Sequence, residues 1–205
     1  MTSRTLTVIS AGLSEPSSTR LLADQLAASA KSSLSGQGID TIVETIELRD
    51  HAHDLMNNLL TGFPSGDLRA AIDSVVAADG LIAVTPIFNA SYSGLFKSFF
   101  DVLETDSLSG KPALIAATGG TPRHSLALEH AMRPMFAYLR SIVVPTSVFA
   151  AAEDWGTGRR VGRALSDRID RAGGDLASLV GDRPPAGPVD PFADATPFEQ
   201  LLAGS

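Results

Sequence analysis

Residues 80–101 read GLIAVTPIFNASYSGLFKSFFD, an apolar run followed by a turn-rich passage and a Phe-rich segment. A continuous apolar run such as residues 80–85 is typical of a strand buried on both faces of a parallel sheet. Pro86 has no backbone N–H and is expected to end that strand. Ser93 can cap a helix predicted over residues 94–103. The stretch therefore predicts a buried strand, a polar loop and a helix.

The same alternation of strand and helix continues on both sides of this stretch. Apolar and β-branched runs predict strands at residues 6–9, 39–48, 80–85, 113–117 and 141–149. Helical periodicity predicts helices over residues 17–34, 67–78 (with Asp67 as the cap), 94–103, 125–139 and 159–180. The mixed segment 49–66 predicts a long loop with at most one helical turn, and residues 118–122 predict a turn. Five strands alternating with helices predict an α/β fold with a doubly wound parallel sheet.

The composition indicates one domain. The chain has 205 residues, and 44% of them are hydrophobic, which is enough for a sizeable core. Its 16 basic and 23 acidic side chains give a formal net charge of −7, so neither nucleic acid nor a membrane is an expected partner. The absence of cysteine excludes disulfides, thiol nucleophiles and Cys-ligated metals. With no apolar stretch long enough for a signal peptide or a transmembrane helix, a cytoplasmic protein is expected.

The C-terminal end differs in composition from the rest of the chain. Five prolines between residues 184 and 197 prevent the last helix from continuing. We therefore expect a domain over residues 1–182 and a Pro-rich arm over residues 183–205. The arm has apolar side chains that can dock on this subunit or on a neighbour, at Phe192, Phe198, Leu201 and Leu202. A frayed terminus is the alternative.

Three loops after parallel strands carry the small and polar residues of a ligand site. Ligands bind at the carboxyl ends of such strands, and hydroxyls at a helix N-terminus suit a phosphate. The candidate residues are Ser10, Ser14, Ser17, Ser18 and Thr19 in the first loop, Pro86, Ile87, Phe88, Asn89, Ala90 and Ser91 in the second, and Thr118, Gly119 and Gly120 in the third. For the first loop, hydroxyls that only cap the helix are the alternative. Neither a Walker motif nor G-x-G-x-x-G follows the first strand.

Residues 85–101, TPIFNASYSGLFKSFFD, resemble the P-x-Y-N-x-S-x-x-G-x-[LF]-K-N-x-[LF]-D signature of NADPH-dependent FMN reductases. The first loop is similar to that family's G-S-x-R-x-x-S loop, with Ser17 and Thr19 at hydroxyl positions, and residues 118–120 resemble its glycine turn. The resemblance covers residues 6–149, and it points to the subgroup that accompanies luciferase-like monooxygenases.

This resemblance implies a flavodoxin-like fold with a five-stranded sheet in the order 2-1-3-4-5. It implies that the FMN phosphate lies in the first loop, with the isoalloxazine between the second and third loops. Ser14 and Ser18 stand where relatives often have arginines, so the phosphate would be held by hydroxyls and N–H groups. Such binding is weaker and suits FMN as a diffusing substrate. Phe88 replaces a common tyrosine and keeps the ring without the hydroxyl.

Hydride transfer between two cofactor rings needs no protein nucleophile, so no catalytic acid or base is predicted. Arg123 is a candidate partner of the NADPH 2′-phosphate and His124 of the ring edge, with an exposed charge and a helix cap as the alternatives. His51 and His53 lack a second ligand cluster, so no metal site is expected. Trp155 either lines the cleft or anchors the arm.

The expected function is that of an NAD(P)H-dependent FMN reductase that transfers hydride from NADPH to FMN and supplies reduced flavin to a partner monooxygenase. A flavodoxin-like electron carrier and an FMN-dependent quinone or azo-dye reductase are the alternatives. Scattered acidic residues favour the enzyme, because a carrier needs dense acidic patches for docking. The apolar side chains of residues 55–63 and of the Phe-rich helix predict a homodimer or homotetramer. Burial in the core of the same chain is the alternative, and for the Phe-rich helix it is the favoured one.

Overall fold

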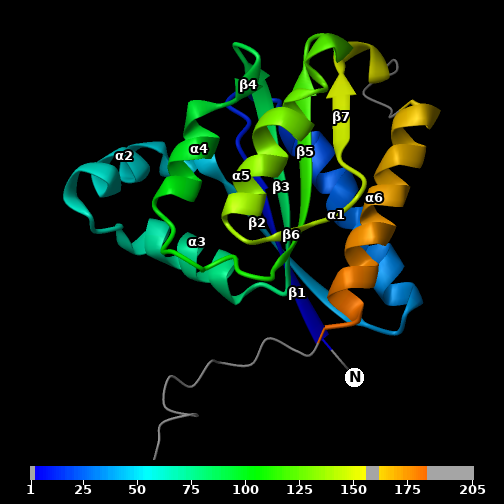
Figure 1. The fold of residues 1–205 in the computed structure, drawn as a ribbon, viewed down its shortest axis with the longest axis horizontal. Helices are drawn as coiled ribbons and strands as arrows, with labels where there is room; N and C mark the ends of the chain where they lie inside the picture. Colours follow the sequence, from blue (N-terminus) through cyan, green and yellow to red (C-terminus); the bar gives the residue numbers. More distant parts are fainter. Residues whose placement is uncertain (1–2, 156–161, 184–205) are drawn as a thin grey trace, which may run out of the picture.

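The computed structural model describes residues 3–155 and 162–183. Apart from Arg183, the Pro-rich arm lies outside the described residues, and so do its four apolar side chains. Helices cover both faces of one central sheet, as Figure 1 shows. The prediction of a doubly wound α/β fold is confirmed.

The sheet has seven strands. They are β1 (Ser3–Ser10), β2 (Asp40–Glu47), β3 (Gly80–Phe88), β4 (Ser91–Tyr92), β5 (Pro112–Gly119), β6 (Ile142–Val143) and β7 (Val148–Ala151). The pairing order is β2-β1-β3-β5-β6; β7 also pairs with β5, and only β4 is antiparallel, on β3. This order corresponds to the predicted five-strand order 2-1-3-4-5. The numbering differs because the short strand β4, which was not predicted, lies in the sequence between the third and fourth predicted strands.

The prediction of one strand over residues 141–149 is wrong, because this segment forms two short strands, β6 and β7. β6 pairs with the start of β5 and β7 with its end. Pro145 lies between them and has no N–H for the ladder. Arg133 instead binds this connection, donating to the carbonyl oxygens of Val144 at 3.1 Å and Pro145 at 3.3 Å.

Pro86 does not end β3, contrary to the prediction. The strand continues to Phe88, and Pro86 pairs in register with Thr118 of β5. Val84 turns its carbonyl toward β1, where it accepts the N–H of Ala11 at 2.9 Å. Backbone groups two residues apart face the same side of a strand. The backbone nitrogen of Pro86 therefore lies on the side of β3 that faces β1. Because β1 has already ended at this level, the strand loses no ladder hydrogen bond there.

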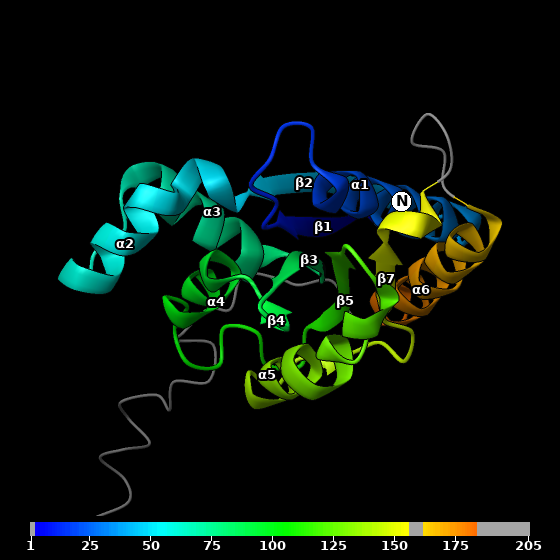
Figure 2. The ribbon, with the colours of Figure 1, turned by 90° about the horizontal axis from the view of Figure 1, so that it is seen from above.

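The segment predicted as a long loop, 49–66, is mostly helical. A 3₁₀ turn, η1 (Leu48–His51), leads into α2 (Ala52–Thr61), which ends at Gly62 with a left-handed φ of 78°. Only Leu55 and Asn58 of α2 are buried, so the sequence shows little helical periodicity. In Figures 1 and 2, α2 lies at the far left and projects from the body of the domain.

The other helices follow the predicted pattern with shifted boundaries. They are α1 (Ser18–Gly36), α3 (Gly66–Ala77), α4 (Gly94–Asp101), α5 (Arg133–Tyr138) and α6 (Arg163–Gly181), with short turns η2 (Pro122–His124), η3 (a π-helix, Leu128–Met132) and η4 (Ala152–Asp154). The predicted helix 125–139 is thus a π-helical turn followed by α5. Ser65, not Asp67, caps α3, because its Oγ accepts the N–H of Leu68 at 3.4 Å. Thr118 and Gly119 belong to β5 and not to the turn after it.

Alternate residues of each central strand face two separate cores. On β3, Leu81 and Ala83 face the core under α3, α4 and α5, whereas Ile82 and Val84 face the core under α1 and α6. Burial on both faces explains the continuous apolar run. Figure 2 shows the sheet between these two helical layers. Within the described ranges, no helix has the length and apolar character that a bilayer span requires.

Candidate functional site

A cleft of about 530 Å³ opens at the carboxyl ends of the parallel strands. This volume is in the range of nucleotide-sized ligand sites. Its walls come from four connections: Leu13, Ser14, Ser17, Ser18 and Thr19 after β1; Pro86, Ile87 and Phe88 at the end of β3; Thr118, Gly119 and Gly120 at the end of β5; and Ala152 and Trp155 after β7. Two other hollows, of about 420 and 770 Å³, lie among α2, α3, α4 and α5, away from the strand ends.

The first loop presents the N-terminus of α1 to the cleft. Ser17 caps the helix, and its Oγ accepts the N–H of Arg20 at 3.1 Å. The N–H groups of Ser18 and Thr19, in the first turn, donate to no other group of the described residues. Free N–H groups at the positive end of a 19-residue helix attract an anion. Capping and anion binding are therefore compatible here, because the cap occupies a different N–H.

Gly12 permits the close packing of this loop. A Cβ at Gly12 would lie 2.0 Å from Ser17 Oγ and 3.1 Å from the Cβ atoms of Ser17 and Thr19. Only a residue without a side chain fits at that position. Gly12 was not among the predicted site residues, because its closeness to Ser17 arises from the folding of the loop.

A hydroxyl pair joins the first and third loops across the floor of the cleft. The Oγ1 atoms of Thr19 and Thr118 lie 2.8 Å apart, and both residues are buried. At the end of β1, the hydroxyl of Ser10 is buried and has no hydrogen-bond partner in the described structure. A buried, unpaired hydroxyl costs free energy, so a ligand or a water at this point would stabilise the fold.

The second loop is a tight hairpin between β3 and β4. Asn89 and Ala90 have positive φ angles of 48° and 67°. Thr85 Oγ1 accepts the N–H of Ser93 at 3.1 Å, and Ser93 Oγ then caps α4 by accepting the N–H of Phe96 at 3.2 Å. These bonds fix the hairpin and leave Phe88 half-exposed at the cleft.

The third loop brings the backbone of β5 against the cleft without side chains. A Cβ at Gly119 would lie 2.8 Å from Cζ of Phe149, whereas one at Gly120 would meet nothing within 4 Å. Gly119 therefore lets β5 pack against the Phe149 ring. Gly120 leaves the surface of the cleft open for a flat ligand.

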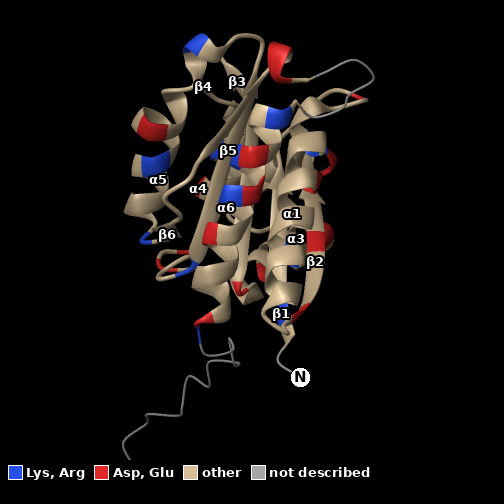
Figure 3. Ribbon diagram, turned by 90° about the vertical axis from the view of Figure 1, so that its right-hand side faces the viewer, with Lys and Arg blue, Asp and Glu red and all other residues tan. Residues whose placement is uncertain are grey.

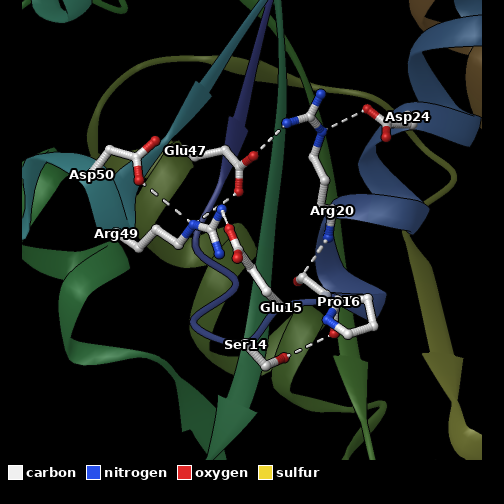
Figure 4. Close-up of polar contacts among 9 residues, drawn as sticks. Ser14, Glu15, Pro16, Arg20, Asp24, Glu47, Arg49 and Asp50 are labelled. Atoms are coloured by element: carbon white, nitrogen blue, oxygen red, sulfur yellow. Dashed lines mark hydrogen bonds and ion pairs between the residues drawn. The ribbon is translucent and has the colours of Figure 1, made fainter.

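Two arginines near the first loop are bound to carboxylates and do not serve the cleft. Arg20 pairs with Asp24 at 2.8 Å and with Glu47 at 2.5 Å, and the hydrogen bond that it donates to Asp24 raises the pKa of Arg20. Arg49 pairs with Glu15 and lies 3.3 Å from Glu47. Figure 4 shows both guanidinium groups directed into this cluster of acids. The donors that remain at the start of α1 are neutral.

The structure brings together most, but not all, of the predicted residues. Ten line the cleft: Ser14, Ser17, Ser18, Thr19, Pro86, Ile87, Phe88, Thr118, Gly119 and Gly120. Six do not: Ser10, which is buried, Asn89 and Ala90 in the hairpin turn, Ser91 at the start of β4, and Arg123 and His124 in η2. Leu13 and Ala152 line it and were missed, and Trp155, for which two roles were open, also lines it.

No metal centre is evident among residues 3–155 and 162–183, where no three His, Asp or Glu side chains gather. His51 ends η1 and His53 lies in the first turn of α2. The cleft offers a row of neutral phosphate donors, the aromatic side chains of Phe88 and Trp155, and a glycine-lined floor. These groups fit a phosphorylated, flat, aromatic cofactor.

Comparisons with known proteins point to one family. A family model described as NADPH-dependent FMN reductase matches residues 5–156. An FMN reductase (NADPH) of Pseudomonas aeruginosa is 37% identical over 175 residues, which is 85% of this chain and 91% of that protein. The NADH-dependent FMN reductase SfnF of Pseudomonas putida is 34% identical over 164 residues, 80% of this chain and 86% of that protein.

Solved structures agree in fold. An oxidoreductase of Corynebacterium diphtheriae has a TM-score of 0.85 at 48% identity, with 90% of this chain and 100% of that chain covered. The apo form of the NADH:FMN oxidoreductase EmoB has a TM-score of 0.77 at 30% identity, with 89% and 93% covered. A flavodoxin-like neighbour, the WrbA-like protein of Agrobacterium tumefaciens, is 14% identical and supports the fold alone.

Proposed function

Because the chain belongs to the NADPH-dependent FMN reductase family, we propose that its strand-end cleft is where this oxidoreductase binds FMN and a reduced nicotinamide nucleotide. When bound, the two cofactors supply the hydride donor and the hydride acceptor, so the protein contributes position and environment. No side chain of the cleft is needed as a nucleophile or proton donor. The role of each residue depends on the groups that it presents to the cleft.

The phosphate end of FMN belongs at the start of α1. The free N–H groups of Ser18 and Thr19 lie at the positive end of the helix dipole and can donate to the phosphate. The hydroxyls of Ser14 and Ser17 lie in the same wall of the cleft. These residues bind the phosphate with neutral groups. Ser10, at the end of β1, is buried and does not line this wall.

The ring end belongs between the second and third loops. Phe88 supplies an aromatic surface, and residues 118–120 supply a floor of backbone. The opening of the cleft then leaves one face of the ring accessible to the nicotinamide, which must approach to about 3–3.5 Å for transfer. Arg123 and His124 do not line this cleft, so any contact they make with NADPH would be at its outer rim.

We further propose that reduced FMN leaves the enzyme and serves a partner monooxygenase. The observation that carries this proposal is the pairing of Arg20 and Arg49 with carboxylates in Figure 4, which withholds cations from the phosphate site. An arginine would add a bidentate ion pair to the hydrogen bonds that neutral N–H and O–H groups make with a phosphate, so a phosphate held by neutral groups alone exchanges more readily. Such an activity would belong in the cytoplasm.

A flavodoxin-like carrier is the weaker alternative. Such a protein would dock its partners through a dense acidic patch. In Figure 3, basic and acidic positions alternate along α1 and α6, and no single sign dominates the visible face. This distribution supports an enzyme that releases a small product.

The discriminating experiment measures NADPH oxidation by the purified protein with and without added FMN, together with its absorption spectrum as isolated. Turnover that requires added FMN, and reduced FMN in the filtrate of an anaerobic ultrafiltration, would support the proposal. Bound flavin with turnover only on addition of a quinone would favour a quinone reductase. Bound flavin with negligible NADPH oxidation would favour the carrier.

We also propose a homodimer or homotetramer. Helix α2, which projects from the domain in Figure 2, exposes large apolar side chains at Met56, Leu59 and Leu60, and Phe63 follows it. Leu60 is 86% exposed and Phe63 80%. Apolar side chains gathered on one projecting element are typical of a contact surface.

A further inference from the structure

Trp155 is the only tryptophan in the chain, and it lies on the wall of the cleft formed after β7. None of the three candidate loops builds this wall. The residue is partly buried and packs against the core beneath α6, which includes Leu165 and Ile169. Its ring therefore has one side in the protein core and another at the cleft.

The position of Trp155 is fixed by Asp154. One carboxylate oxygen accepts the N–H of Ala151 at 2.8 Å, and the other accepts Nη2 of Arg168, from α6, at 2.9 Å. The carbonyl oxygen of Asp154 accepts the N–H of Gly162 at 3.0 Å, where a Cβ would come within 2.9 Å of it. Bonds from a strand, a helix and a glycine thus hold the turn η4 in place.

Trp155 is partly buried, and its indole N–H is not among the buried polar atoms that lack a partner in the described structure. A tryptophan at the wall of a cleft presents an apolar ring together with one N–H donor, which suits an aromatic, polyhydroxylated ligand. Phe88, at the end of β3, lines the same cleft and offers a second aromatic surface.

We propose that Trp155 contacts the bound flavin nucleotide, and that the Asp154–Arg168 ion pair is a positioning element that holds it there. This inference rests on the proposed function, because it takes FMN as the ligand of the cleft. It adds a fourth wall, after β7, to the three loops that resemble the family's signature.

The test compares FMN dissociation constants, from equilibrium titration, of the wild type, Trp155→Leu and Trp155→Phe, with Tyr138→Ala as the matched control. Tyr138 is 87% exposed on α5 and lies outside the cleft. Loss of an aromatic contact weakens binding by about 2- to 12-fold. We expect that weakening in Trp155→Leu, near wild-type affinity in Trp155→Phe and no change in the control.

Leucine is chosen because it keeps an apolar surface against α6, so that a loss of FMN affinity can be distinguished from a loss of stability. Trp155→Leu with a wild-type melting temperature and wild-type FMN affinity would overturn the contact. Wild-type protein that binds no FMN would instead overturn the proposed function, so the two failures differ.

The positioning role is tested with Arg168→Met. We expect weaker FMN binding, a red-shifted emission of Trp155 in the flavin-free protein, and no additional loss when Arg168→Met is combined with Trp155→Leu. If the ion pair were purely structural, Arg168→Met would lower the melting temperature and leave the emission maximum and the FMN affinity unchanged. That outcome, or full additivity of the two losses, would overturn the positioning role.

Discussion

The substitution Gly12→Ala tests whether the first loop is built to present N–H groups to a phosphate. The new Cβ would lie 2.0 Å from Ser17 Oγ, far inside van der Waals contact, and 3.1 Å from the Cβ atom of Thr19. Because Gly12 lies close to the end of β1, which is held in the sheet, the serine has to give way. Its Oγ then no longer accepts the N–H of Arg20.

Two effects of different size are expected. Loss of the N-cap costs about 1 kcal/mol of stability, which lowers the melting temperature of a domain of this size by about 2–4 °C. The 3.1 Å contacts with the Cβ atoms of Ser17 and Thr19 also require the first turn of α1 to shift by a few tenths of an ångström, which weakens the hydrogen bonds from the Ser18 and Thr19 N–H groups to a charged phosphate. Such bonds are worth about 1.5–3 kcal/mol each, so loss of one or both at the smaller value lowers FMN affinity by roughly 10- to 100-fold.

The assay is an equilibrium FMN titration beside a thermal melt without flavin. Gly174→Ala is the matched control, because a Cβ there, in α6, meets nothing within 4 Å. We expect the control to keep wild-type affinity and to be slightly more stable. If Gly12→Ala lowers the melting temperature but binds FMN as tightly as the control, the phosphate does not lie on the first turn of α1.

Four further changes test other parts of the structure. Ser17→Asp keeps a good N-cap but repels the phosphate, so stability should hold while FMN affinity falls, and less so at high salt; equal affinity in a titration would contradict this site. Thr118→Val breaks the bond to Thr19, and a double-mutant cycle with Thr19→Val should show that the losses in FMN affinity are not additive. Leu60→Lys should shift the mass measured by light scattering toward the monomer, and an unchanged mass would exclude α2 from the interface. Burial lowers the pKa of Lys111 to about 8, so between that value and its ordinary 10.5 the unfolded chain binds more protons and stability should rise with pH; urea unfolding should show no such rise in Lys111→Met.

The sequence predicted the parts of the fold that depend on local pattern. The apolar run at residues 80–85 indicates a doubly buried strand because both of its faces meet a core. Helix α2 escaped the same reasoning, since only Leu55 and Asn58 of its ten residues are buried and neither forms a repeating stripe. Pro86 was expected to end its strand, although the strand tolerates it once β1 no longer lies beside it.

The residues of the candidate site likewise fall into two groups: those that the local sequence pattern predicts and those that depend on the folded chain. Hydroxyls at Ser17 and Thr19 are visible in the sequence because a helix begins at the same place. The contact between Gly12 and Ser17 depends on how the loop closes, and the placement of Trp155 depends on β7 pairing with the end of β5. A rule that considers the residues after every parallel strand, including the last strand, would have found Ala152 and would have favoured the cleft role of Trp155 over the anchoring role.

Glu47 holds a position between two guanidinium groups, with Arg20 on one carboxylate oxygen and Arg49 on the other. This one side chain keeps two cations occupied within a short distance of the helix start that the loop presents. Exchange of that acid for a neutral residue would remove the carboxylate that the two arginines share and leave Arg20 with Asp24, and Arg49 with Glu15 and Asp50. Both guanidinium groups would then be held by fewer bonds and freer to turn toward a phosphate at the helix start, so an acid remote from the hydride bears on how readily the flavin leaves.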